Sequence, residues 1–293
     1  MNKRDSLHPD RLFPPDPVTR DIARRLYARV EKLPIVSPHG HTDPSWFALD
    51  ELFPNAVDLL LIPDHYLVRM LYSQGISMES LGIPTIDGTE VESDKRKIWQ
   101  LFAEHYYLFR GTPSRSWLDH VFYEVFDLGQ SLTPDNADEL FDAINESLLK
   151  DEFRPRALFD KFNIELLATT ESPLDELEHH KTIRDSDWDG RVVTAYRPDP
   201  VVDPEFEGFA DNVARFGELA GEDASTWDGY LAAHRNRREF FKRMGATSTD
   251  HGHPTAVTAD LSRAECKALF DKALRGRCSE TEAETFRGQM LTE

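Results

Sequence analysis

The sequence predicts an α/β fold built on a parallel sheet or barrel, because short β-like runs alternate with helical segments along its second half. The runs are IELLATT at 164–170, RVVTAY at 191–196 and GATSTD at 245–250, and an earlier run, LPIVS, lies at 33–37. Segments of helical pattern, such as TWDGYLAAHRNRREFFKRM, separate the later runs. These strands alone are too few for a closed parallel barrel, which takes eight.

The first 49 residues are expected to form one helix and the first strand. In DPVTRDIARRLYARVEKL, Asp16 is a candidate N-cap and Pro17 stands at the first helical position. Apolar residues recur at 18, 22, 26 and 30, which is the spacing of one helix face. This amphipathic helix leads directly into the apolar run at 33–37.

Residues 50–163 have mostly helical patterns, for example SDKRKIWQLFAEHYYLF and TPDNADELFDAINESLL. We interpret them as a helical insertion after the first strand and not as a separate domain. Within this stretch, Asp64 is expected to cap the helix DHYLVRMLYSQGI. Residues 164–293 then continue the sheet or barrel.

Composition excludes some classes of partner. The 293 residues include 53 acidic and 34 basic side chains, a formal net charge of -19, which opposes binding to nucleic acid or anionic lipid. A small anionic ligand would therefore need particular arginines. The first residues lack the apolar core of a signal peptide, and the longest apolar run is too short to span a bilayer. We expect a cytoplasmic protein whose Cys266 and Cys278 are reduced thiols, and a homo-oligomer is compatible with the sequence.

Polar side chains follow the predicted strands at their carboxyl ends, where parallel α/β folds collect their chemistry. His39 and His41 close the first run, Arg197 follows the third, and Asp250 and His251 follow the fourth. Residues two apart on a strand point the same way, so both imidazoles of HGH can bind one metal ion. The HxH pattern alone does not separate metal ligands from ordinary turn histidines.

The other polar positions also leave two interpretations open. Arg197 precedes a proline and fits an exposed loop charge, and turn chemistry explains Asp250 but not His251. His65 and Tyr66 suit proton transfer or a plain helix surface. The adjacent pair His179 and His180, which helix geometry directs to different sides, is interpreted as surface.

Six segments, in this order, resemble uronate isomerase (glucuronate isomerase), a divergent family of the amidohydrolase superfamily. They are PIVSPHGHTDP, DHYLVRMLYSQGI, SRSWLDH, LLATTESPLDELEHH, YRPDP and GATSTDHG, spread from about residue 11 to the end of the chain. The resemblance implies a distorted (β/α)8 TIM-type barrel with a helical insertion after the first strand. It also implies an aldose–ketose isomerase that interconverts D-glucuronate with D-fructuronate, and D-galacturonate with D-tagaturonate, through an enediol.

The matching segments carry the site that the resemblance implies, with a small-molecule uronate sugar as the ligand and a divalent metal, expected to be Zn²⁺, as the cofactor. The implied roles are metal ligation by His39 and His41, catalysis by His65, Tyr66 and Asp250, and substrate binding by Arg197 and His251.

The sequence departs from the family pattern at three places. HGH stands where the family often has HCH, and TTESP replaces TTDDP, which puts Glu171 and Ser172 at two acidic positions. The family also continues well beyond residue 293, so the chain is expected to lack the C-terminal barrel strands and their catalytic groups. A metal-dependent hydrolase of the same superfamily, an inactive truncated product and a non-catalytic binding protein stay open as alternatives.

Overall fold

A computed structural model describes residues 7–293 of the chain. The chain divides into two compact units, and each is described by itself. The first unit takes residues 1–33 and 51–161, and the second takes residues 34–50 and 162–293. The sequence analysis divided the chain at 49/50 and 163/164, into an N-terminal segment, an insertion and a continuation of the barrel. That division stays a prediction.

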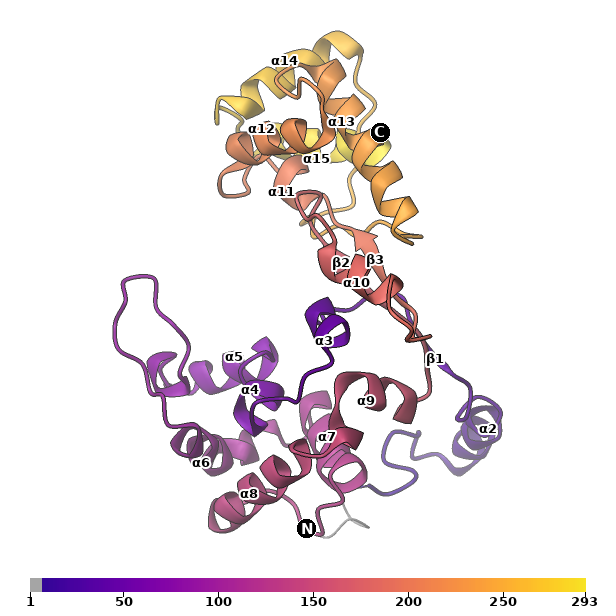
Figure 1. Cartoon of the computed structure of the whole chain (residues 1–293), viewed down its shortest axis with the longest axis vertical. Coiled ribbons are helices and arrows are strands. Elements are labelled where there is room, and N and C mark those ends of the chain that lie inside the picture. Colours follow the sequence, from indigo (N-terminus) through magenta and orange to yellow (C-terminus); the bar gives the residue numbers. More distant parts are fainter. Residues whose placement is uncertain (1–6) are drawn as a thin grey trace. The chain divides into compact units, whose positions relative to one another are not determined.

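In the described part of the first unit, all regular secondary structure is helical, and loops connect the helices (Figure 1). Its α-helices are α2 (Pro17–Tyr27), α4 (Ala56–Leu60), α5 (His65–Ser73), α6 (Lys95–His105), α7 (Pro113–His120), α8 (Ala137–Leu148) and α9 (Pro155–Lys161). Short 3₁₀ or π turns complete it: η1 (Glu79–Leu81), η2 (Tyr106–Phe109), η3 (Val121–Val125), η4 (Pro134–Asn136) and η5 (Asp151–Phe153).

An aromatic core holds the first unit together. Trp99 and Phe102 lie on the buried face of α6, with ring centroids 5.6 Å apart, and Phe122 of η3 packs against Trp99. The indole Nε1 of Trp99 donates a hydrogen bond of 3.0 Å to the carbonyl oxygen of Ala137 at the start of α8. The bond satisfies the polar end of a buried indole and fixes α6 against α8.

Two helix caps confirm the sequence predictions. The carboxylate of Asp16 accepts a hydrogen bond from the backbone N–H of Thr19 at the start of α2. Asp64 likewise accepts from the backbone N–H groups of Tyr66 and Leu67 at the start of α5. Helix α2 ends at Tyr27, earlier than its apolar spacing predicts, and none of its residues is buried. Helices this short gain most of their stability from packing against the rest of the protein. Because α2 buries no residue, packing does not stabilise further turns beyond Tyr27.

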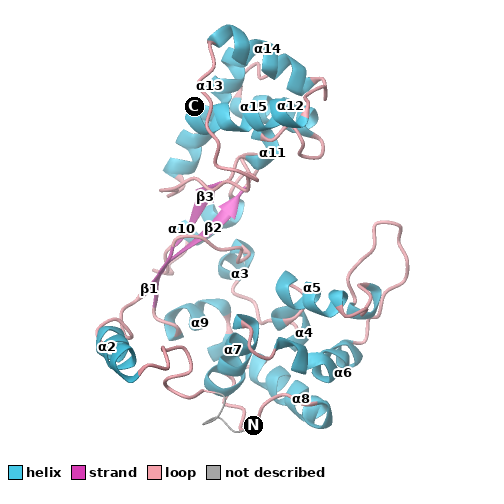
Figure 2. Cartoon of the chain, turned by 180° about the vertical axis from the view of Figure 1, so that it is seen from behind, coloured by secondary structure: helices cyan, strands magenta, loops and turns pink. Residues whose placement is uncertain are grey.

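The second unit combines a small sheet with helices (Figure 2). The strands β1 (Ile35–Ser37), β2 (Ile164–Glu171) and β3 (Val192–Tyr196) form a three-stranded parallel sheet in the order β1-β2-β3. The helices are α3 (Pro44–Leu49), α10 (Glu178–Arg184), α11 (Asp199–Val202), α12 (Phe209–Ala220), α13 (Trp227–Arg243), α14 (Arg263–Leu274) and α15 (Glu280–Thr292).

The register of the sheet brings the strand ends to one edge. Ser37 pairs with Leu167, and Glu171 pairs with Tyr196, so the residues that follow β1, β2 and β3 leave the sheet on the same side. The predicted runs at 164–170 and 191–196 are confirmed as strands, and 33–37 is confirmed in its last three residues. The side chains after these strands are therefore positioned to form one site.

The prediction of a fourth strand at 245–250 is wrong. These residues make one isolated parallel bridge, between Thr249 and Tyr196. Tyr196 N–H donates to the carbonyl oxygen of Ser248, and Asp250 N–H donates to the carbonyl oxygen of Tyr196. Because no further strand of the described residues pairs with this run, it stays irregular, yet the bridge fixes Asp250 beside the end of β3.

The α/β fold is confirmed, with a sheet smaller than a barrel. The described residues form three strands in one sheet, so the (β/α)8 barrel stays a prediction.

Beyond the sheet, α11 to α15 enclose an aromatic cluster that includes Phe216, Tyr230, Phe270 and Phe286. The hydroxyl of Tyr230 donates a 2.6 Å hydrogen bond to the carbonyl oxygen of Val201, which ties α13 to α11. No helix in residues 7–293 combines the length and apolar character needed to cross a bilayer.

Candidate functional site

His39 and His41 lie just beyond the end of β1, with ring centroids 4.9 Å apart and ring planes nearly perpendicular. The Nδ1 atom of His39 lies 3.4 Å from Oδ1 of Asp250. The Nδ1 atom of His41 lies 3.2 Å from the hydroxyl of Thr170 near the end of β2. Partners on Nδ1 of this kind orient a histidine ring and fix its tautomer, as they do for metal-ligating histidines.

Gly40 has a local reason to separate the two histidines. Its carbonyl oxygen accepts a hydrogen bond of 3.3 Å from the Thr170 hydroxyl. A Cβ atom at position 40 would lie 3.2 Å from the carbonyl oxygen of Ala168 on β2, closer than an ordinary contact. The small residue therefore lets the end of β1 approach β2 and holds both imidazoles at the strand ends.

Arg197 follows β3, and its guanidinium lies between two carboxylates. Its Nε donates to Oδ2 of Asp199 at 2.7 Å, and its Nη1 lies 3.1 Å from Oδ2 of Asp250. The backbone N–H of Arg197 donates to the carbonyl oxygen of Glu171, which fixes the main chain at the end of β2. The side chain is 32% exposed and contacts two carboxylates, so Arg197 is a partly exposed, paired charge at the strand end.

Asp199, at the start of α11, holds the loop that follows Asp250. Its side chain is 12% exposed, and both carboxylate oxygens accept the backbone N–H of Gly252 at 3.0 Å. A Cβ atom at position 252 would lie 2.5 Å from Nη2 of Arg197 and 3.1 Å from Oδ2 of Asp199. Glycine therefore allows the loop to lie directly on the Arg197–Asp199 pair.

A chain of charged contacts thus joins the ends of the strands, running from His39 through Asp250 and Arg197 to Asp199. Four of the sequence-predicted residues, His39, Arg197, Asp250 and His251, lie in this neighbourhood of the second unit, and His41 lies beside His39. The charge of Arg197 is neutralised from two sides, so its guanidinium is held in a fixed orientation while part of it faces solvent.

Sequence reasoning missed Asp199 and His253. Nε2 of His253 lies 3.6 Å from Oδ1 of Asp199, and its side chain is only 4% exposed. Ligand atoms of Asp199, His251 and His253 all lie within 4.8 Å of one another, a grouping that can hold a metal ion. The signal was present in the sequence, because HGH occurs a second time, at 251–253.

His65 and Tyr66 occupy the first turn of α5, in the first unit. Their ring centroids lie 4.2 Å apart, and Tyr66 is 58% exposed. The guanidinium carbon of Arg69 lies 5.7 Å from the Tyr66 ring centroid, so a cation faces the phenol ring. The assignment of His65 and Tyr66 to catalysis stays a prediction.

The interpretation of His179 and His180 as surface residues is wrong for His180. His180 is 3% exposed, and its Nε2 lies 2.8 Å from the hydroxyl of Thr169 on β2. Burial lowers the pKa of His180 to about 4. Nearby Glu171 is also buried and accepts a hydrogen bond from Thr194, and burial raises the pKa of its carboxyl group. Glu171 therefore faces the interior of the unit at a position where the family pattern has an aspartate.

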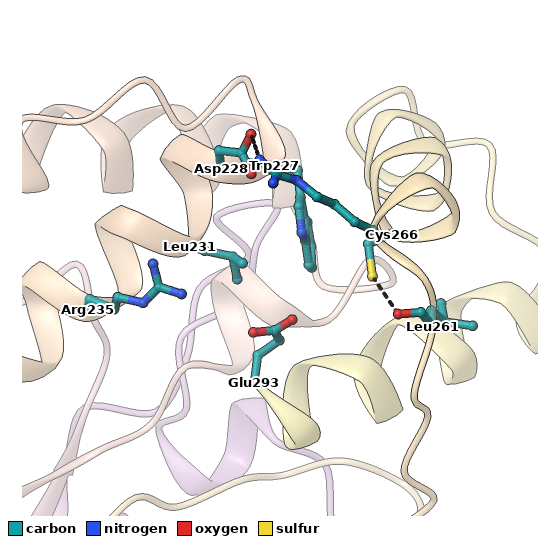
Figure 3. Close-up of a pocket in the computed structure, with 8 residues that line it drawn as sticks. Trp227, Asp228, Leu231, Arg235, Leu261, Cys266 and Glu293 are labelled. Carbon is teal, nitrogen blue, oxygen red and sulfur yellow. Dashed lines mark hydrogen bonds and ion pairs between the residues drawn. The ribbon is translucent and has the colours of Figure 1, made fainter.

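A groove lies at the α13–α14 end of the second unit (Figure 3). Its volume is about 600 Å³, and Trp227, Leu231, Arg235 and Cys266 are among its lining residues. None of the sequence-predicted site residues lines it. The strand-end cluster is therefore the better candidate for chemistry.

The fold and the cluster define an α/β protein whose parallel strands present histidine, arginine and aspartate side chains at their carboxyl ends. Comparison with known families agrees with the sequence resemblance: the model of the glucuronate isomerase family matches residues 17–293. The chain belongs to the glucuronate isomerase family.

Individual relatives support the same family. A uronate isomerase from Xanthomonas axonopodis pv. citri is 63% identical over 288 residues, and one from Phenylobacterium zucineum is 61% identical over 293 residues. The crystal structure of glucuronate isomerase from Caulobacter crescentus matches with a TM-score of 0.93 at 57% identity, over 98% of this chain and 60% of that one. The uronate isomerase structure from Thermotoga maritima matches at 26% identity with a TM-score of 0.85, over 97% of this chain and 60% of that one.

The matches cover nearly all of this chain but only part of each relative. The alignments span 98% and 100% of the chain and 61% of each of the two curated relatives. The chain thus spans about three fifths of their length.

Proposed function

We propose that the protein carrying this chain is a uronate isomerase that interconverts D-glucuronate with D-fructuronate and D-galacturonate with D-tagaturonate. The strongest single support is the family match over residues 17–293, which contains every residue assigned to the site. The charged cluster at the strand ends is consistent with it, because a sugar acid needs a cation, hydrogen-bond donors and a base in one place. The protein acts in the cytoplasm, and its fold is a distorted (β/α)8 barrel.

Arg197 binds the substrate carboxylate or a hydroxyl beside it. A guanidinium offers a planar fork of N–H donors that matches a carboxylate, and Asp199 and Asp250 hold that fork in place. Because both aspartates already neutralise the guanidinium, Arg197 contributes directed N–H donors to the substrate more than a net positive charge. His251, next to Asp250 in the loop, contributes a second contact to the substrate.

His39 and His41 bind a divalent metal ion, which we propose to be Zn²⁺. The residues fit such an ion because two imidazoles lie side by side, and Nδ1 of each lies near an oxygen of Asp250 or Thr170 that orients the ring. When bound, the ion supplies a Lewis acid that polarises substrate oxygens.

The reaction moves one proton from C2 of the aldose to C1 through an enediol, while the O2 proton is lost and O1 gains one. Asp250 is a carboxylate at the strand edge, placed against His39 and Arg197, and takes part in this proton transfer. Tyr66 carries a proton in the same step, and His65 beside it orients or assists the phenol. No bond to a leaving group breaks.

A substrate panel tests this function. The protein expressed from its own gene is incubated with D-glucuronate and D-galacturonate in D₂O, and ketose formation with solvent deuterium at C1 is followed by NMR. We expect both aldoses to be converted. In parallel, amides, lactones and phosphoesters are tested for hydrolysis. Hydrolysis without ketose formation would favour the metal-dependent hydrolase, and neither reaction would favour a non-catalytic chain.

A further inference from the structure

Asp199, His251 and His253 form a cluster that the isomerase chemistry proposed above does not require as a unit. Their ligand atoms all lie within 4.8 Å of one another, the only such group of three among residues 7–293. Nε2 of His253 and Oδ1 of Asp199 are 3.6 Å apart. Ligands about 2.0–2.2 Å from a tetrahedral ion lie at roughly this separation from each other. One pair of the cluster therefore already has the separation of two ligands on one ion, and the third ligand lies within 4.8 Å of both.

The His253 ring gives the second observation. Both of its ring nitrogens are buried without a hydrogen-bond partner, and the side chain is only 4% exposed. An imidazole in that position loses its bonds to water and gains none from the protein, which costs free energy. A metal ion bound at Nε2 would satisfy one of those nitrogens. Burial also lowers the pKa of His251 and His253, which favours the neutral form that binds metals.

The surroundings orient the aspartate as the partners of metal ligands do. Arg197 donates to Oδ2 of Asp199 at 2.7 Å, and Gly252 N–H bonds to both oxygens. These contacts lock the carboxylate with Oδ1 toward His253. Gly252 also keeps His251 and His253 two residues apart, on a loop that has no room for a Cβ.

We propose that Asp199, His251 and His253 bind a divalent transition-metal ion, at a site separate from His39 and His41. Two imidazoles and one carboxylate form a borderline donor set, suited to Zn²⁺ or Co²⁺ and poorly suited to Mg²⁺ or Ca²⁺. His251 then binds the ion through a ring nitrogen, and Arg197 keeps its role in substrate binding. This proposal of a metal site does not depend on whether the protein isomerises uronates.

Metal stoichiometry tests the site without any activity assay. The starting protein is the double variant His39→Asn/His41→Asn, so that the family pair contributes no binding. Titration with Co²⁺, followed by visible absorption and by equilibrium dialysis, should show one bound equivalent. Adding His253→Asn should remove that equivalent or weaken it at least 10-fold, whereas adding His179→Asn, a partly exposed histidine on α10, should leave it unchanged.

Two results would overturn the site: no bound equivalent in the double variant, or an equivalent that persists unchanged with His253→Asn. If the His253→Asn protein does not fold, X-ray absorption of Zn²⁺ in the double variant decides instead. Two imidazole nitrogens and at least one carboxylate oxygen at about 2.0–2.2 Å support the site, and an all-oxygen shell contradicts it. Loss of isomerase activity with binding intact would contradict only the proposed function.

Discussion

At the scale of single residues, the contacts around Arg197 show how the strand-end cluster is held in place. The side chain is held by Asp199 on one side and Asp250 on the other, and Asp250 in turn contacts His39. A guanidinium fixed by two carboxylates is oriented before a substrate arrives, which lowers the entropy lost on binding. Under the proposed function, Asp199 and Asp250 would therefore affect substrate binding through the orientation of Arg197.

Asp199→Asn should weaken substrate binding through Arg197. The substitution keeps the shape but removes the charge that orients the guanidinium, and a hydrogen bond to a charged group contributes about 1.5–3 kcal/mol. We expect KM for D-glucuronate to rise by about 10- to 100-fold, with a smaller change in kcat. Steady-state kinetics measure both.

A matched control for that substitution is Asp228→Asn. Asp228 also pairs with an arginine, Arg263, but both side chains are more than half exposed. Exposed ion pairs contribute little, so the kinetics should stay at the wild-type values. Equal effects of the two substitutions, or an unchanged KM for Asp199→Asn, would remove Asp199 as a positioning residue.

Tyr66→Phe should depress turnover if the phenol carries the proton. Removing a general acid–base group of this kind costs about 100-fold or more in kcat. Tyr72→Phe is the matched control, because Tyr72 lies on the same helix and is 59% exposed against 58% for Tyr66. Measured kcat values that are the same for both variants would exclude Tyr66 from the mechanism.

The residue scale also shows how far sequence could predict the site. His39, His41 and Arg197 were found because they follow strands of one parallel sheet, and parallel strands end at one edge. Asp250 was found from a run that pairs with β3 through one bridge only, which still places it at that edge. Asp199 was not found because an aspartate at the start of a short helix fits ordinary capping. Its role depends on contacts with Arg197 and Gly252, more than fifty residues away in the case of Gly252, and such contacts leave no local pattern.

At the scale of elements, strands were predicted correctly where an apolar run also has neighbouring strands to pair with. The prediction failed where a β-like run lacks such neighbours. Strands β2 and β3 are apolar runs with partners on the sheet, and both were predicted. The run at 245–250 has one bridge partner, so its β-like composition is not enough to make a strand. His180 was misjudged because helix α10 directs its ring toward Thr169 of β2, a contact that the helical pattern alone does not predict.

Helix α10 gives the protein a pH-dependent stability through His180. Its pKa of about 4 lies below the ordinary 6.5, so the unfolded chain binds the proton first as pH falls. The free energy of unfolding should therefore decrease between pH 6.5 and pH 4, by about 3 kcal/mol from this group. Buried His234, whose pKa is lowered to about 3, acts in the same direction, and Glu171 acts in the opposite one.

Comparison of His180→Asn with the wild type isolates that effect, since His234 and Glu171 are present in both. Chemical denaturation at pH 7 and at pH 4 gives the free energy of unfolding of each protein. The wild type should lose about 3 kcal/mol more than the variant. His179→Asn should follow the wild type, and a parallel loss in wild type and His180→Asn would refute the assignment.

At the scale of the whole molecule, the division into two units separates the predicted site residues. His65 and Tyr66 belong to the first unit, whereas the strand-end cluster belongs to the second. The sequence predicted the helical character of residues 50–163 from their periodicity, and the structure has helices there. The closed barrel could not be derived from strand patterns within this chain, since only three runs pair as strands in residues 7–293.

Metal binding should stabilise the folded protein as a whole. A ligand that binds only the native state adds about 2.7 kcal/mol to the free energy of unfolding at 100 times its Kd. Thermal unfolding with and without Zn²⁺ should show a higher Tm with the ion, and Mg²⁺ should have no such effect. The double variant His39→Asn/His41→Asn should lose the larger part of the shift, and an undiminished shift would argue against the histidine pair.

The claim on which the others depend is that the strand-end cluster binds the sugar acid, and Arg197→Lys tests it most directly. Lysine keeps the charge but not the planar fork that pairs with a carboxylate. We predict that kcat/KM for D-glucuronate falls by about 100-fold while the variant stays folded. A kcat/KM equal to that of the wild type would contradict the account, because the cation held by Asp199 and Asp250 would then have no part in recognising the substrate.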